Sequence, residues 1–505
     1  MNERQGLPPQ TTLGALVAGC TGARFFGCDA STPVQGATSD SRRAVPGMLF
    51  VALKGGAHDG HVFVDDVLAR GAAAVLVDDG AATPSGPHIR VADTWQALPL
   101  VASAAWGDPA AQMRLVGVTG TNGKTTTAHL VGAIFRAASR LHARLGTTGN
   151  WLVDHEDHAG FTTAFPIELQ ALVAEARGRG ATDLVMEVSS HALAQARVAP
   201  LRYHAVGLTS FSQDHLDFHR DMADYLAAKC LLASTYLRDD GVAIAATDDQ
   251  PASLAFLHAA RGIGARAWRA SRGAVPDAEI LARDIEYAAT HTRARVETPV
   301  GAIALVTPLV GPFNLDNVLV AIGLALGVGV DGETIAAGLA SSRGAPGRLE
   351  SVRVENVRGP VVLVDYAHTP DAVERTLAVL RPLARGKLVV LLGCGGDRDP
   401  SKRPLMGEIA GRDADVFWAT SDNPRTEPPE SIVAQMVAGA AGARAEVIVE
   451  VDRAQAIAAA IAAAADDDIV LLAGKGHEDY QQIGDTKIHF DDREHARAAL
   501  LRRGG

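Results

Sequence analysis

The chain has 505 residues and a formal net charge of −11. Because a single hydrophobic core stops growing at about 250 to 300 residues, this length predicts two or three domains. An acidic chain does not favour binding to the phosphate backbone of nucleic acids, so we expect no nucleic-acid partner. The 4 cysteines lack the paired spacing of a zinc site or a disulfide framework, which fits a reducing cytoplasm.

The sequence also predicts no membrane insertion. Residues 1–10 do not have the basic and apolar regions of a signal peptide. The apolar runs 318–330 and 456–465 are shorter than the roughly 20 residues that cross a bilayer, and the second is typical of a plain alanine-rich helix. We therefore expect a cytoplasmic protein.

The order of apolar runs predicts an α/β chain. In the first segment, the β-rich runs LFVAL and AAVLV flank a helical pattern at 63–70. From Leu115 onward, strands and helices alternate until the turn-rich stretch 341–348, which favours a mostly parallel sheet. Beyond that stretch, apolar runs again end in polar or glycine-rich tips, as in a Rossmann-like doubly wound sheet. We expect three α/β domains, at residues 1–107, 108–343 and 344–505.

The strongest local motif is LVGVTGTNGKTTT, in which an apolar strand runs into glycines and a helix is expected from about Ala128. Successive backbone N–H groups and a helix N-terminus bind phosphate, a lysine reaches the β- and γ-phosphates, and a threonine hydroxyl can hold Mg²⁺. Val118 stands where such loops usually have glycine. A dinucleotide-binding turn is the alternative, but the G-x-G-x-x-G spacing is absent. The predicted phosphate-binding residues are Gly120, Thr121, Asn122, Gly123, Lys124, Thr125 and Thr126.

Two further motifs are candidates for a metal site. Glu187 ends an apolar run, where a carboxylate can hold Mg²⁺, although a cap on the following helix is the alternative. His215 lies among acids and becomes a metal candidate together with Glu187. Lys229 follows in a helical pattern, and composition alone indicates a solvated lysine.

The third segment carries mixed charges on several predicted strand tips. Such a set suits a zwitterionic substrate, because arginine binds a carboxylate through two parallel hydrogen bonds and acids bind ammonium groups. Independent surface ion pairs are the alternative. The residues concerned include Asp365, His368, Arg398, Asp422, Asn423, Arg425 and Glu478.

Together these motifs resemble the Mur ligases of peptidoglycan synthesis. GTNGKTT, MEVSSHAL, DHLDFH, GPFNLDN, GRLE, DYAHTPD, GCGGDRD, SDNPR and GKGHE occur in that family's order over nearly the whole chain. The chain departs from the family pattern at 209–212, where it reads T-S-F-S in place of T-N-L-S. The resemblance implies an ATP-dependent ligase that acts as a monomer and joins meso-diaminopimelate to the UDP-N-acetylmuramoyl-dipeptide through an acyl-phosphate.

The resemblance also implies a role for each matching residue. It makes Lys124, Glu187, His215 and Lys229 catalytic. It makes Thr125, Glu187, His215 and a CO₂-derived carbamate on Lys229 the magnesium ligands. ATP would further contact Asn314, Arg348, Asp365 and His368. The UDP-sugar peptide would contact Ser39, Ser41, Thr162, Thr163, Ser189, Gln195 and Arg197. Diaminopimelate would be held by Arg398, Asp422, Asn423, Pro424, Arg425, Gly474 and Glu478.

Three alternatives stay open at this point. One is a ligase of the same family that uses L-lysine or another amino acid, and another is a folylpolyglutamate-type ligase. Arg425 discriminates here, because its guanidinium can pair with the distal carboxylate that lysine lacks. The third is a nucleotide-binding switch protein, which would not need the charged tips of the third segment.

Overall fold

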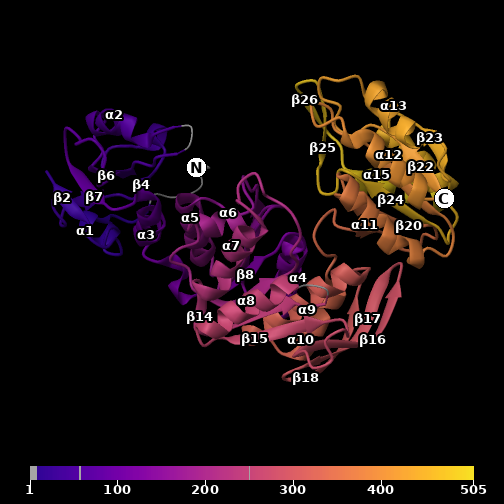
Figure 1. The fold of residues 1–505 in the computed structure, drawn as a ribbon, viewed down its shortest axis with the longest axis horizontal. Helices are drawn as coiled ribbons and strands as arrows, with labels where there is room; N and C mark the ends of the chain where they lie inside the picture. Colours follow the sequence, from indigo (N-terminus) through magenta and orange to yellow (C-terminus); the bar gives the residue numbers. More distant parts are fainter. Residues whose placement is uncertain (1–7, 56–57, 249–250, 505) are drawn as a thin grey trace. The chain divides into compact units, whose positions relative to one another are not determined.

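The computed structural model describes residues 8–55, 58–248 and 251–504 (Figure 1). The chain divides into two compact units. Unit 1 comprises residues 1–281 and 319–338, and unit 2 comprises residues 282–318 and 339–505. Both units are α/β, with mostly parallel sheets, as predicted. Within the described ranges, no helix combines the length and the apolar character that crossing a membrane would require.

The N-terminal part of unit 1 is built on a five-stranded sheet. Its order is β2 (Arg24–Phe26), β7 (His88–Val91), β6 (Ala74–Asp78), β5 (Leu49–Val51) and β4 (Ala37–Thr38). Successive residues of β6 point to opposite faces, so Val75 and Val77 pack with α2 (Val64–Ala69), while Leu76 packs with α1 (Leu13–Leu16) and α3 (Thr94–Ala105). The small α/β segment predicted here is confirmed.

The central sheet has parallel strands at its middle. Its order is β11 (His155–Asp157), β10 (Asn150–Leu152), β9 (His142–Leu145), β12 (Asp183–Glu187), β8 (Arg114–Thr119), β13 (Tyr203–Leu208), β14 (Leu237–Ala246), β15 (Arg266–Ser271), β16 (Ile280–Ala288), β17 (His291–Thr298) and β18 (Gly301–Thr307). In this order, the neighbouring strands between β9 and β16 pair in parallel. The β11–β10, β10–β9 and β17–β18 pairs are antiparallel. Its helices are α4 (Lys124–Ala137), α5 (Pro166–Gly178), α6 (Ser190–Ala194), α7 (Met222–Ser234), α8 (Pro251–Gly262), α9 (Pro312–Gly327) and α10 (Gly332–Ser341).

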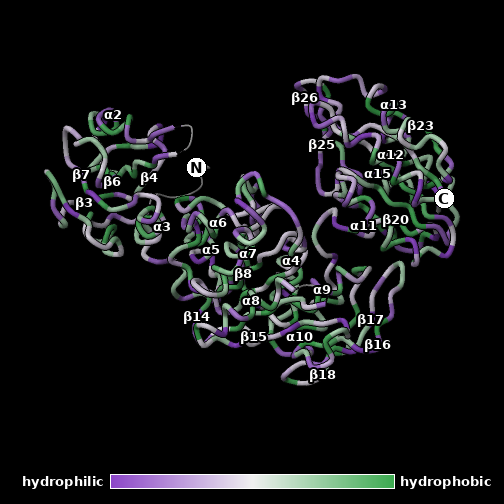
Figure 2. The backbone as a smooth tube through the Cα atoms, viewed as in Figure 1, coloured by the Kyte–Doolittle hydropathy of each residue, from purple (hydrophilic) through white to green (hydrophobic). Residues whose placement is uncertain are grey.

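The C-terminal part of unit 2 is a doubly wound sheet. Its order is β19 (Glu350–Val352), β20 (Val361–Asp365), β24 (Ile469–Ala473), β21 (Leu388–Leu392), β22 (Val416–Ala419) and β23 (Glu446–Val449), and every pair except β19–β20 is parallel. The inner strands β20, β24, β21 and β22 consist almost entirely of buried hydrophobic residues, and hydrophobic segments run through this part of the chain in Figure 2. Helices α11 (Pro370–Leu380), α12 (Lys402–Asp413) and α13 (Pro429–Gly439) cover one face, and α14 (Arg453–Ala463) and α15 (Asp492–Gly504) cover the other. The alanine-rich run is a helix, α14, as expected.

The hairpin of β25 (Tyr480–Ile483) and β26 (Thr486–His489) follows β24. In a parallel sheet the carboxyl ends of the strands share one edge, and ligands bind there. The loops after β20, β21, β22 and β24 therefore gather the charged tips that the sequence analysis singled out.

Candidate active site

The phosphate-binding loop joins β8 to α4. Gly123 has a φ of 87° and is the N-cap of α4, which begins at Lys124, about one turn before the expected start at Ala128. Gly120 has a φ of 149°, and a Cβ atom there would lie 2.1 Å from Thr209 Oγ1, so the position requires glycine. The Nζ atom of Lys124 donates to the main-chain oxygens of Gly120 (2.8 Å) and Thr121 (3.0 Å). The loop thus combines a helix N-terminus with a cation, as phosphate binding requires.

Glu187 lies at the end of β12, beside Val118 of β8, and its side chain is buried. One carboxylate oxygen accepts a hydrogen bond from Thr125 Oγ1 (3.0 Å), and Thr147 donates to both oxygens from its N–H (2.9 Å) and its hydroxyl (3.1 Å). Ser189, not Glu187, caps α6, because its hydroxyl accepts from the Ala192 N–H (3.2 Å). The alternative in which Glu187 caps this helix is therefore wrong.

Lys229 lies in α7 and only 1% of it is exposed, so the interpretation as a solvated lysine is wrong. Burial, reinforced by the charge of Lys124, holds the pKa of Lys229 well below its usual value. Its Nζ atom lies 4.3 Å from the centroid of the Tyr225 ring. The Tyr225 hydroxyl in turn lies 3.1 Å from Thr121 Oγ1, which links α7 to the phosphate-binding loop.

His215 precedes α7 and has a φ of 54°, a conformation that is uncommon outside glycine. Its ring lies 5.9 Å from that of Tyr225, and Nε2 lies 3.5 Å from Asp214. Burial lowers the pKa of His215, which favours the neutral imidazole that a metal ligand must be. His219 connects the same region to α6, because Nε2 lies 3.0 Å from Ser190 Oγ.

Five predicted substrate residues form one cluster beside Glu187, which we call the Thr163 cluster. The Thr163 hydroxyl donates to the Glu187 main-chain oxygen (2.9 Å) and accepts from the Ser189 N–H (3.0 Å). Arg197 donates to Gln195 (2.7 Å) and to the Thr163 main-chain oxygen (3.4 Å). The cluster consists of Thr162, Thr163, Ser189, Gln195 and Arg197.

Within the Thr163 cluster, Thr162 approaches Thr147 (3.0 Å), which is also a partner of Glu187. The two remaining substrate predictions of unit 1 are placed elsewhere. Ser39 and Ser41 follow β4 of the five-stranded sheet, where the Ser41 main-chain oxygen accepts from Arg70 (2.6 Å). They belong to a different sheet from the Thr163 cluster.

Among the described residues, one group of three His, Cys, Asp or Glu side chains has its potential metal-ligand atoms within 4.8 Å of one another. It comprises His155, Asp157 and Glu175, and it includes neither Glu187 nor His215. Arg179 also bonds to Glu175 (3.0 Å), so this carboxylate already has a cationic partner.

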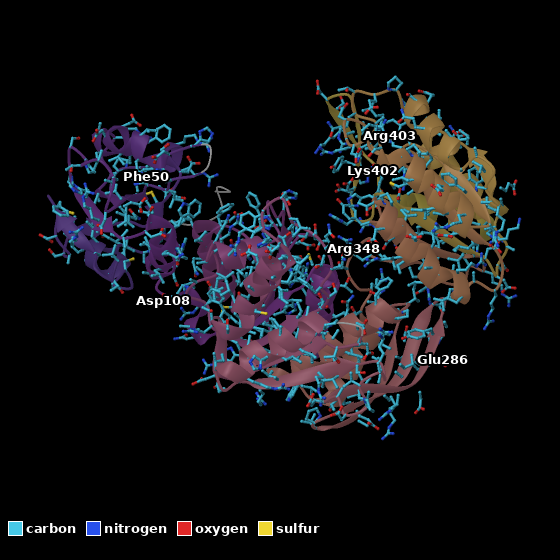
Figure 3. All side chains as sticks on the ribbon, viewed as in Figure 1. Phe50, Asp108, Glu286, Arg348, Lys402 and Arg403 are labelled. Carbon is cyan, nitrogen blue, oxygen red and sulfur yellow. The ribbon has the colours of Figure 1, made fainter. Side chains whose placement is uncertain are left out.

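The predicted nucleotide residues of unit 2 centre on Tyr366. The guanidinium of Arg348, labelled in Figure 3, lies 4.7 Å from the centroid of the Tyr366 ring, and the His368 ring lies 4.5 Å from it. Asp365 is buried and accepts from the N–H groups of Leu349 (2.8 Å) and Ala367 (2.9 Å), and burial raises its pKa. Asn314 lies in α9, where it donates to the Val310 main-chain oxygen (2.9 Å).

The predicted amino-acid residues lie on three loops, 395–398, 422–427 and 474–478, which we call the amino-acid loops. Arg425 has a φ of 52° and donates to the Gly396 main-chain oxygen (2.7 Å). A Cβ atom on Gly395 would lie 2.8 Å from Arg425 Nη1 and 3.7 Å from Arg398 Cγ, so both arginines flank this glycine. A Cβ atom on Gly396 would lie 1.9 Å from the Pro424 main-chain oxygen, so the first two loops are in close contact.

The third amino-acid loop contributes one acid, Glu478, which lies near Asp422 of the second loop. Asn423 Nδ2 donates to Glu478 (2.9 Å), and burial, followed by the charge of Asp422, raises the pKa of Glu478. Gly474 has a φ of 112°, and a Cβ atom there would lie 2.7 Å from an Asp422 carboxylate oxygen. Unit 2 therefore combines guanidinium groups and carboxylates on adjoining loops, an arrangement that suits a zwitterionic amino acid.

Several residues around these sites escaped the sequence analysis. Tyr225 carries no distinctive spacing, and His219 was part of DHLDFH without a role of its own. The contacts of both side chains arise from the fold. Arg453 at the start of α14 and Asp492 at the start of α15 form a buried ion pair (2.5 Å). Lys475 counted among the charged tips of the third segment, within GKGHE, but its burial and an individual role were not predicted.

Comparison with known proteins identifies the family of the chain. Models described as the Mur ligase family catalytic domain, the Mur ligase middle domain and the Mur ligase glutamate ligase domain match residues 33–111, 118–325 and 347–476. UDP-N-acetylmuramoyl-L-alanyl-D-glutamate–2,6-diaminopimelate ligase of Gloeobacter violaceus is 44% identical over 472 residues, which cover 93% of this chain and 94% of that protein. The protein of the same name from Synechococcus elongatus is 45% identical over 478 residues, with 93% and 94% covered.

Solved structures agree with these matches. A structure of a ligase with the same name has a TM-score of 0.74 at 31% identity and covers 95% of this chain and 97% of its own. Folylpolyglutamate synthase of Mycobacterium tuberculosis, complexed with ADP and AMPPCP, has a TM-score of 0.57 at 18% identity over 80% of this chain and 94% of its own, which shows a common fold alone. The chain belongs to the Mur ligase family.

Proposed function

We propose that the chain is an ATP-dependent ligase that adds meso-2,6-diaminopimelate to UDP-N-acetylmuramoyl-L-alanyl-D-glutamate, in the cytoplasm and as a monomer. The observation that carries this proposal is the gathering of one guanidinium group and two carboxylates on the amino-acid loops. Arg425 and Asp422 share one loop, and Asn423 of the same loop donates to Glu478 (2.9 Å). The guanidinium can bind the distal carboxylate of diaminopimelate through two parallel hydrogen bonds, and the acids can bind its ammonium group. Relatives that carry this activity in their names are 44% and 45% identical to the chain.

In the proposed reaction, a carboxylate oxygen of the UDP-linked dipeptide attacks the γ-phosphorus of ATP, and ADP leaves. The amine of diaminopimelate then attacks the carbonyl carbon of the acyl-phosphate, loses a proton, and expels phosphate as the amide forms. The phosphate-binding loop holds the nucleotide phosphates through its N–H groups and Lys124. Asn314, Arg348, Asp365 and His368 complete the nucleotide contacts.

Thr125, Glu187 and His215 fit a site for Mg²⁺, because a hydroxyl, a buried carboxylate and a neutral imidazole are all metal ligands. Lys229 fits carbamylation, because its buried amine has a lowered pKa and only a neutral amine reacts with CO₂. When bound, Mg²⁺ would neutralise charge on the transferring phosphoryl group. The carbamate would add an anionic oxygen ligand to this set.

The two other substrates have separate proposed sites. Ser39, Ser41 and the Thr163 cluster hold the UDP-sugar peptide. Diaminopimelate is held by Arg398, Asp422, Asn423, Pro424, Arg425, Gly474 and Glu478. We accordingly propose that residues 1–107 bind the UDP-sugar, 108–343 bind ATP and 344–505 bind the amino acid.

The direct test is phosphate release by purified protein supplied with ATP, Mg²⁺, the UDP-linked dipeptide and meso-diaminopimelate. We expect release only when all four are present, together with a UDP-linked tripeptide of the matching mass. L-lysine in place of diaminopimelate tests the related specificity and should be a poor substrate. Phosphate release that does not depend on the amino acid would contradict the proposal.

A further inference from the structure

Lys475 is completely buried, which is unusual for a charged side chain, and it lies directly behind the proposed amino-acid site. Its Nζ atom donates to Asn423 Oδ1 (3.1 Å) and to the Tyr480 main-chain oxygen (2.6 Å). The same Nζ atom lies 3.9 Å from an Asp422 oxygen and 3.9 Å from a Glu478 oxygen. The one ammonium group therefore lies within 4 Å of three side chains of the proposed site, those of Asn423, Asp422 and Glu478.

The contact with Asn423 determines which way its amide points. The Oδ1 atom receives two donors, Lys475 Nζ and the Gln482 N–H (2.9 Å), so it must be the oxygen. The amide nitrogen is then turned toward Glu478 and donates to it (2.9 Å). In this way Lys475 fixes the orientation of the Glu478 carboxylate through Asn423, without donating a hydrogen bond to Glu478 itself.

The charge of Lys475 has a second effect. Burial, followed by the charge of Asp422, raises the pKa of Glu478, because two carboxylates in one poorly solvated place repel. A buried ammonium group 3.9 Å from both offsets this repulsion. The side chains of Asp422 and Glu478 keep 11% and 20% of their surface exposed while Lys475 keeps none, so a substrate ammonium meets the carboxylates and not the lysine.

We propose that Lys475 is a positioning residue for amino-acid recognition: it orients Asn423 and keeps Asp422 and Glu478 arranged to receive the substrate's ammonium group. This inference rests on the proposed function. The inference extends the proposed function by assigning a role to a residue that would touch no substrate.

Substitution of Lys475 tests the inference. Lys475→Met keeps the length of the side chain and removes the charge and the donors. We expect the KM for meso-diaminopimelate to rise about 10- to 100-fold, since the net value of hydrogen bonds to charged groups corresponds to such a change. The KM values for ATP and the UDP-linked dipeptide, and kcat at saturating amino acid, should stay within about threefold, since Lys475 contacts none of their proposed sites. Lys475→Gln, which keeps a donor for Asn423, should recover part of the loss.

Asp468→Asn is the matched control. Asp468 is also buried and accepts from the N–H groups of Lys387 (2.6 Å) and Ala465 (2.7 Å), but it precedes β24 and so lies at the opposite end of that strand from Lys475. The Asp468→Asn substitution should lower the melting temperature without changing the KM for meso-diaminopimelate.

The outcomes separate the two proposals. If wild-type protein shows no amino-acid-dependent phosphate release, the proposed function fails, whatever the variants do. If wild-type protein is active but Lys475→Met changes the amino-acid KM no more than Asp468→Asn does, or raises all three KM values alike, the role of Lys475 is overturned. Failure of both Lys475 variants to fold, with Asp468→Asn folded, would likewise overturn it in favour of a structural role.

Discussion

The Nζ atom of Lys229 lies 4.3 Å from the centroid of the Tyr225 ring, within a helix whose tyrosine also reaches the phosphate-binding loop. If Lys229 carries a carbamate, Lys229→Ala should lower kcat by about 100-fold or more, the usual cost of removing one preorganised electrostatic group. A small carboxylic acid such as propionate should restore part of the activity by filling the vacated space. Steady-state phosphate release with and without the acid measures both effects.

Lys229→Met is the control for this rescue, because it also removes the amine but leaves no room for the acid. It should be inactive and should not respond to propionate. In addition, ¹³C-labelled bicarbonate should give a carbamate signal in the NMR spectrum of the wild type and not of Lys229→Met. Full activity of either variant would remove the carbamate from the mechanism.

Tyr225→Phe should weaken ATP binding and leave Lys229 in place. The change removes the hydroxyl that approaches Thr121 (3.1 Å) and keeps the ring beneath the lysine. A hydrogen bond of this kind contributes about 0.5 to 1.5 kcal/mol, so the KM for ATP should rise about 2- to 12-fold. Initial rates at varied ATP measure the change, and an unchanged KM would show that the link does not matter for nucleotide binding.

Arg425→Ala should raise the KM for meso-diaminopimelate by about 30-fold or more, because truncation of one partner in a hydrogen-bonded charge pair costs about 2 to 5 kcal/mol. The kcat/KM for L-lysine should change little, so the preference for meso-diaminopimelate over L-lysine should become smaller. Arg425→Lys keeps the charge without the fork and should recover only part of the affinity. Competition between the two amino acids, analysed by product mass, measures the ratio. Untouched use of diaminopimelate in Arg425→Ala would refute the specificity argument.

Arg453→Met should destabilise unit 2. The guanidinium pairs with Asp492 inside the protein and also donates to the main-chain oxygen of Ala473 (3.0 Å). Removal of one partner leaves a buried unpaired charge, which costs about 3 to 5 kcal/mol. Urea denaturation measures the loss in the free energy of unfolding. The double variant Arg453→Met with Asp492→Leu should be more stable than the single one, and the opposite order would contradict this explanation.

Glu427 should contribute to the pH dependence of stability. Hydrogen bonds from Arg403, labelled in Figure 3, and then from the Asp397 N–H lower the pKa of Glu427 from 4.5 to about 2. Because the folded pKa is the lower one, the stabilisation is present above about pH 4.5 and is lost as the pH falls toward 2. Melting temperatures of the wild type and of Glu427→Gln should therefore converge as the pH falls through this range. Glu430→Gln, at an exposed position in α13, is the control and should not reproduce the convergence.

The sequence predicted the features that depend on local pattern. The glycine-rich turn before Lys124 and the charged tips after the apolar runs have recognisable spacing, and parallel strands bring such tips to one edge. The antiparallel β17–β18 extension was not predicted, because alternating and continuous apolar runs of this length do not specify a partner strand.

Burial of single charged side chains was beyond the sequence. Lys229 lies in the run AAKCLL and Lys475 in GKGHE, and lysine side chains are mostly exposed in folded proteins. Their burial arises from segments distant in sequence, such as the loop that carries Asn423. The family resemblance gave Lys229 a role. It gave none to Lys475, although GKGHE contains this lysine, and none to the Arg453–Asp492 pair.

The backbone of Arg425 is fastened on both sides to the β25–β26 hairpin: its N–H donates to the Gln482 main-chain oxygen (3.0 Å), and its own oxygen accepts from the Gly484 N–H (2.7 Å). A backbone segment that is hydrogen-bonded to a hairpin at both its N–H and its oxygen has little freedom to move toward a shorter or longer amino-acid substrate. An engineer who wants this scaffold to accept a new amino acid should therefore exchange side chains on a fixed frame and leave the loop length alone. Insertions at this turn would break the hydrogen bonds to the hairpin before they changed which amino acids the site accepts.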